Sequence, residues 1–170
     1  MFSNSTFTRL SLLVGLGLIL FVVETFIPRP LPWLKPGLAH VATLVALYGY
    51  GSRAALIVVV ARIMLGAIVL GTLFNPAFIL SFSGGITATL FMAFFKQYFS
   101  KVFSIFGISI IGAVIHTLTQ LFLVALLIVQ KIEIFYLMPV MILSSIFTGF
   151  VVAFVSYLII SKIEIISLNS

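Results

Sequence analysis

Charge is scarce in this chain, and both cysteine and aspartate are absent. Only 7% of the 170 residues are charged, and three acidic residues, all glutamate, stand against nine basic ones. Without cysteine there is no disulfide framework and no thiolate metal site. Without aspartate there is no acidic cluster of the kind that holds magnesium against a diphosphate. We therefore expect no metal site, no cofactor and no diphosphate chemistry carried out by this chain.

The sequence also argues against two further functions, ATP hydrolysis and nucleic-acid binding. Neither glycine-rich stretch leads into a Gly-Lys-Ser or Gly-Lys-Thr sequence, so the chain has no nucleotide-binding loop and is not expected to hydrolyse ATP itself. The formal charge of +6 invites comparison with nucleic-acid binders. The basic residues are scattered, however, mostly at the ends of apolar runs, and they form no patch. We expect no nucleic-acid partner.

Apolar residues make up 63% of the chain, and its mean hydropathy is +1.39. Such a composition predicts an all-α integral membrane protein, multi-pass in the cell membrane and surrounded by the lipid bilayer. Each span needs about 20 residues, so the chain has room for six helices and no soluble domain. We predict a single domain, residues 1–170, with spans at approximately 10–27, 37–50, 54–73, 75–95, 104–129 and 136–161.

The second run, Gly37 to Tyr50, is short for a span, so it is extended by Lys35-Pro36, tilted or partly buried. A proline-rich linker, residues 28–36, precedes it, and Trp33 within that linker fits an interfacial anchor. On the sixth run, Ser145, Gly149 and Ala153 form a row of small residues at the spacing that lets membrane helices approach closely.

The distribution of basic residues predicts the orientation of the bundle. Cytoplasmic loops of membrane proteins carry an excess of lysine and arginine. With both termini inside, the cytoplasmic set is Arg9, Arg53, Lys96, Lys101 and Lys162, against Arg29, Lys35 and Lys131 outside. We therefore predict an N-in/C-in bundle.

Arg62 lies in the middle of the third run, where an arginine costs about 2.5 to 3.5 kcal/mol on insertion scales. With the predicted topology, the other polar residues lie in the outer half of the bundle or near its midplane. This candidate substrate-binding set is Arg62, His116, Gln120, Glu24, His40, Asn75, Ser83 and Gly84. A polar set that ends near the midplane predicts a pocket open to the outside, with the linker as its lid. Gly84-Gly85 would form the floor of this pocket or permit close packing of the helices.

The roles of the charged and titratable residues stay open at this point. Arg62 can be an internal partner of Glu24, the only acid within a predicted span, or a ligand contact, and the two roles are compatible. His116 can be a proton relay, a metal ligand or a hydrogen-bonding core residue. The core or ligand-bonding role is favoured, because no carboxylate stands at metal-ligand spacing from it.

Several stretches together resemble a known family. They are Lys35-Pro36-Gly37-Leu38-Ala39-His40, then Arg62 with Leu65-Gly66, then Ser83-Gly84-Gly85, and finally Gly107-Ile108-Ser109 through Gly112-Ala113 to His116 and Gln120. The chain resembles the Gx transporter group among the substrate-binding (S) components of energy-coupling factor (ECF) transporters, often labelled heptaprenyl diphosphate synthase component I. The family commonly has asparagine where this chain has His40 and Thr117.

The resemblance implies a membrane subunit that captures a small vitamin-like or precursor molecule. An anionic group on that molecule would suit Arg62. Its partners would be a transmembrane coupling subunit and two cytoplasmic ATPases. Family members use a small-xxx-small row on the first helix to contact the coupling subunit, and Ser11 and Gly15 stand there in this chain. The alternatives are an accessory subunit of prenyl diphosphate or quinone synthesis, suggested by the family label, and a structural membrane subunit.

Overall fold

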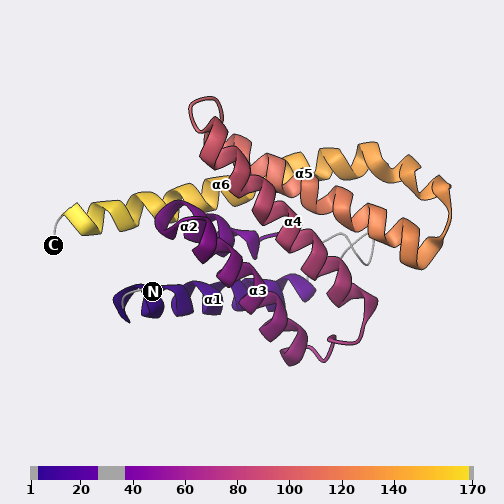
Figure 1. Ribbon diagram of the computed structural model, residues 1–170, viewed down its shortest axis with the longest axis horizontal. Helices are drawn as coiled ribbons and strands as arrows, with labels where there is room; N and C mark the ends of the chain where they lie inside the picture. Colours follow the sequence, from indigo (N-terminus) through magenta and orange to yellow (C-terminus); the bar gives the residue numbers. More distant parts are fainter. Residues whose placement is uncertain (1–3, 27–36, 169–170) are drawn as a thin grey trace.

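The computed structural model describes residues 4–26 and 37–168, with side chains for 6–24, 26 and 37–162. Over these residues every regular element is a helix, and short turns join the helices (Figure 1). Its elements are α1 (Asn4–Thr25), α2 (His40–Tyr50), α3 (Ser52–Val69), α4 (Pro76–Phe99), α5 (Ile105–Val124), the π-helical turn η1 (Ala125–Val129), the 3-10 segment η2 (Ile132–Leu137) and α6 (Met138–Leu168). The start of α1 and the end of α6 lie at the same end of the bundle (Figure 1).

Five helical segments in the described residues are long and apolar enough to cross a membrane. They are 6–24, 52–69, 76–99, 105–129 and 132–162. The chain is thus a multi-pass, all-α membrane protein, as its composition predicts. The six-span count and the N-in/C-in orientation stay predictions.

The predicted second span is a short inner helix. At 11 residues and 1.5 Å per residue, α2 is about 16 Å long, roughly half the thickness of a hydrocarbon core. Every residue from Val41 to Leu47 is buried, and α1, α3 and α6 pack around the helix. Among the readings that the sequence left open, partial burial is the one observed. The proline-rich linker and Trp33 lie outside the described residues.

Local chemistry sets several helix ends. The side chain of Asn75 accepts a hydrogen bond from the Ala77 N–H at 3.0 Å, and Pro76 occupies the first turn of α4; both residue types are favoured at the start of a helix. Helix α3 ends at Val69, short of the predicted Leu73, because Gly71 adopts a positive φ of 64° that an ordinary side chain rarely adopts. Gly51, with φ of 89°, makes the turn between α2 and α3.

The small residues of α6 let it pack directly on the backbone of α5, as their spacing predicts. A Cβ placed on Gly149 would lie 2.8 Å from the Ile110 Cα. On either side of this contact, Ser109 Oγ donates to the Gly149 carbonyl at 2.8 Å, and Ser145 Oγ donates to Thr117 Oγ1 at 2.6 Å. Close approach and polar bonds together join the two helices.

We predict that Gly149→Ala destabilises the protein by about 1 to 3 kcal/mol, the usual cost of overpacking, because the backbone of α5 cannot yield as a side chain can. The measurement is denaturant unfolding in micelles. Gly49→Ala is the matched control, since a Cβ there meets nothing within 4 Å and alanine favours helix over glycine. Equal stability of both variants and the wild type would contradict the packing account.

Candidate functional site

The site is built around the N-terminus of α2, which starts inside the bundle. The first N–H groups of a helix have no partner within the helix and carry partial positive charge. Here the Ala39 N–H donates to Oε1 of Glu24, which reaches it from the last turn of α1, at 3.1 Å. Glu24 is only 2% exposed. The buried carboxylate therefore caps the inner helix and is stabilised by the helix dipole.

Arg62, from the middle of α3, lies beside this helix start and is 3% exposed. Its Nε donates to Thr43 Oγ1 and its Nη2 contacts His40 Nδ1, each at 3.3 Å. Because a guanidinium has no acceptor, His40 must accept through an unprotonated Nδ1. Glu24 and Arg62 line the same small cavity, so the carboxylate lies close enough to act on the guanidinium charge. Arg62 is thus enclosed by one counter-charge and two polar side chains.

Two small cavities meet at a pair of histidines. The rings of His40 and His116 pack edge to face with centroids 4.7 Å apart, and both residues line both cavities. The charged cavity, about 20 Å³, also has Glu24, Arg62 and Ser81 in its wall. Each cavity has room for about one water molecule. The histidines therefore stand between a charged compartment and a second compartment of different chemistry.

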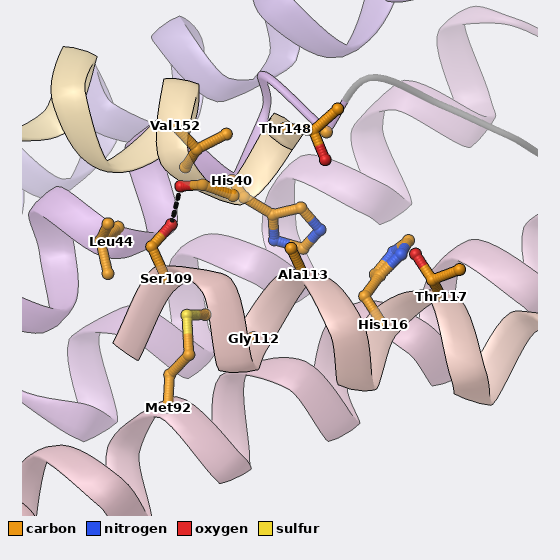
Figure 2. A pocket seen from close by; sticks show the side chains of 12 residues that line it. His40, Leu44, Met92, Ser109, Gly112, Ala113, His116, Thr117, Thr148 and Val152 are labelled. Carbon is orange, nitrogen blue, oxygen red and sulfur yellow. Dashed lines mark hydrogen bonds between the residues drawn. The ribbon is translucent and has the colours of Figure 1, made fainter. Parts of the chain in front are cut away.

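The second compartment is mainly apolar with hydroxyl groups along its wall. It measures about 30 Å³ and lies between α2, α4, α5 and α6. Its wall consists of Gly37, His40, Leu44, Met92, Ser109, Gly112, Ala113, His116, Thr117, Thr148, Gly149 and Val152. Figure 2 shows the His40 and His116 rings side by side, with Thr148 on another part of the wall.

Glycines on α1 and α4 make room for the functional side chains. A Cβ on Gly17 would lie 3.0 Å from the Arg62 Cδ, so this glycine lets the arginine pass between α1 and α3. A Cβ on Gly84 would lie 3.1 Å from the His116 ring and 3.3 Å from Gln120 Cγ. Close packing, one of the roles predicted for Gly84, is therefore observed. The glycine packs against the His116 ring, which separates the two cavities.

The remaining candidate residues differ in their burial and in their position relative to the two cavities. Gln120 is buried one turn from His116, on the face of α5 toward Gly84. Asn75 is exposed as the N-cap of α4, and Ser83 is half-buried; neither lines the two cavities. On α1, Ser11 is exposed and bonded to the Phe7 carbonyl, and a Cβ on Gly15 would meet open space. Helix α1 thus has free surface at these two small residues.

Several site residues were not among the candidates. Thr43, Ser109, Thr117 and Thr148 carry hydroxyls that membrane helices commonly bond to their own backbone, so their sequence signal is weak. Gly17 is one of two glycines in the first apolar run. A helical-wheel projection of 40–50 could have found Thr43, because it lies three residues beyond His40 and therefore on the same face.

The arrangement can recognise polar groups in a buried environment. Arginine, two imidazoles, a carboxylate and a helix N-terminus lie together, so the site offers both donors and acceptors. The Arg62 charge is already balanced by Glu24, so an entering anion must compete with that carboxylate. No group of three His, Asp or Glu side chains that could hold a metal ion occurs within the described part of the chain.

We predict that Glu24→Gln destabilises the protein by about 3 to 5 kcal/mol, because a buried arginine loses its counter-charge while the Ala39 N–H keeps an acceptor. Adding Arg62→Met should recover a large part of this loss, since the double variant has no unpaired charge. Denaturant unfolding of the four proteins of the double-mutant cycle measures the coupling. Additive losses in the double variant would contradict electrostatic pairing.

Comparison with known proteins agrees with the resemblance seen in the sequence. A search of curated proteins and a search of solved structures found no match. The family model described as heptaprenyl diphosphate synthase component I matches residues 13–159, which is most of the chain and includes Glu24, His40, Arg62 and His116. This chain belongs to the heptaprenyl diphosphate synthase component I family.

Proposed function

We propose that this protein is the substrate-capture (S) component of an ECF-type importer in the cell membrane. One observation carries the proposal: a buried arginine is held with two histidines and a carboxylate around the start of a half-length helix, at the meeting point of two cavities. Half-helices whose N-termini point at substrate groups are a recurring design of membrane transporters. Intramembrane charge of this kind marks a functional site by default.

The chemistry of the two compartments suggests what the cargo looks like. A polar or charged group of the cargo would contact Arg62, His40 and His116, and a less polar part would lie against Met92 and the hydroxyl-bearing wall. Both cavities are near the size of one water, so cargo enters only after helices or side chains move apart. A small vitamin-like or precursor molecule fits this requirement. An anionic group would bind by displacing Glu24 from Arg62.

Transport would require partners. The family name describes one component of a complex, and the described chain has no nucleotide-binding loop. A transmembrane coupling subunit and two cytoplasmic ATPases would supply the energy, so this chain is not itself the enzyme. The open surface at Ser11 and Gly15 on α1 is where we expect the coupling subunit to contact the chain.

We predict that Arg62→Lys weakens cargo binding by about 10- to 100-fold, because lysine keeps the positive charge beside Glu24 but loses the planar donors that contact Thr43 and His40. The measurement is ligand-dependent thermal stabilisation across a panel of vitamins and biosynthetic precursors. Arg53→Lys is the matched control, since Arg53 is exposed at the start of the same helix. Equal binding by both variants would contradict the assigned site.

Assembly tests the partner assignment separately. The chain, expressed with a tagged coupling subunit and ATPases, should be recovered in one complex, and replacement of Gly15 by leucine should reduce its recovery. Absence of any complex, together with no stabilising compound in the panel, would count against an S component.

The family name favours a second candidate, an accessory subunit of prenyl diphosphate synthesis. In that case a reconstituted synthase should form prenyl product only when this chain is present. Unchanged synthesis without the chain would remove this candidate.

A further inference from the structure

The turn between α5 and α6 contains a third hollow, which shares no wall residue with the two cavities at the histidine pair. It is a shallow open groove of about 430 Å³, within the 300 to 1,000 Å³ range that is usual for ligand sites. Its wall consists of Phe122, Ala125, Leu126, Gln130, Lys131, Ile132 and Phe135. The turn lies at the opposite end of the bundle from the start of α1 (Figure 1).

The backbone that forms the groove departs from ordinary helix in two places. Helix α5 widens into the π-helical turn η1, and the chain then turns through Gln130, a non-glycine residue with φ of 52°. The Gln130 N–H closes the π turn on the Ala125 carbonyl at 2.9 Å. Such π turns and left-handed residues cost free energy and are frequent at functional sites. Here they aim η2 away from α5 and open the groove between them.

The groove is preformed because η2 is anchored beneath it. Ile134 is buried and packs in one cluster with Leu121, Val124 and Met141. The neighbouring residues Ile132 and Phe135 are left on the surface, 80% and 36% exposed. A stable support and an exposed apolar wall together make a fixed surface, one that can accept a chain of methylene groups without rearrangement.

The two ends of the groove differ in chemistry. Phe122 and Leu126, four residues apart and each 58% exposed, continue the groove down the apolar length of α5. Lys131 and Gln130 stand at the turn, where the chain leaves the membrane-crossing segments. Glu133, the nearest acid along the sequence, is not part of the wall. The groove therefore has a basic end and an apolar end. These two ends complement the negative headgroup and the apolar chain of an anionic amphiphile.

We propose that this groove binds an anionic phospholipid, with its phosphate on Lys131 and an acyl chain against Phe122 and Leu126. Headgroup charge provides the selectivity and the apolar wall provides contact area. One lysine near a membrane surface accounts for about a fivefold preference for an anionic lipid.

The test is native mass spectrometry of the full chain, released from detergent and titrated with phosphatidylglycerol or phosphatidylcholine of the same acyl chains. The wild type should retain phosphatidylglycerol about fivefold more strongly. Lys131→Gln should remove this preference while phosphatidylcholine binding stays unchanged. Ala125→Trp, which fills the groove, should weaken binding of both lipids. Lys101→Gln, an exposed lysine in the turn between α4 and α5, should behave as the wild type.

Three results would overturn the proposal. The first is equal retention of the two lipids by the wild type. The second is an unchanged preference in Lys131→Gln, or unchanged binding of both lipids in Ala125→Trp. The third is an equal loss of preference in Lys101→Gln and Lys131→Gln, which would reduce the effect to general surface charge.

Discussion

The buried charge of Arg62 is the constraint on which the rest of the structure depends. A guanidinium in the middle of a membrane-crossing helix needs a counter-charge and hydrogen-bond acceptors close by. The fold meets this need by bringing two other segments to α3. Helix α1 contributes Glu24 and the space at Gly17, and α2 with its preceding turn contributes Thr43, His40 and the Ala39 N–H. The packing of the first three helices follows from these contacts.

The contacts around Arg62 also make the short inner helix α2 possible. A half-length helix inside a membrane bundle leaves peptide groups at both of its ends without helical partners. Glu24 bonds to the N–H of Ala39 at one end, and Lys96 Nζ donates to the Leu47 carbonyl at 2.7 Å near the other. A negative side chain at the start and a positive one at the finish both match the helix dipole. Opposite charges from α1 and α4 thus hold the inner helix at its two ends.

This arrangement also links binding to structure. The carboxylate that caps α2 is the one that balances Arg62, so a ligand that takes Arg62 from Glu24 changes the environment of the helix start as well. His40, which begins α2, contacts both Arg62 and His116. Under the proposed function, recognition at the charged cavity would therefore be coupled to the position of the inner helix through these three side chains.

The sequence predicts the membrane class, the helical fold and the core of the site for clear physical reasons. Charge within an apolar run is costly, so Arg62, Glu24 and the two histidines stand out, and the structure places them together. Small residues at four-residue spacing predict a close helix contact on the sixth run, and the structure shows that its partner is α5. These signals are local and need no knowledge of the whole fold.

Other features depend on tertiary structure and leave little trace in the sequence. The apolar residues of α2 look like those of a lipid-facing span, because a protein interior and lipid select the same side chains. Asn75 and Arg62 are both polar and both were candidate binding residues, yet only the fold shows that Arg62 lines a cavity and that Asn75 lines neither of the two cavities. Thr43 and Lys96 act through partners far along the chain. Periodicity alone does not find such pairs.

The central claim is that Arg62 and its neighbours hold a small molecule. The most direct measurement is mass spectrometry of the small molecules released from purified wild-type protein and from Arg62→Lys, prepared side by side from the same native membrane. The account predicts one compound at near-equimolar amount with the wild type and its loss from the variant. A wild type that releases no such compound, or equal release from both proteins, would contradict it.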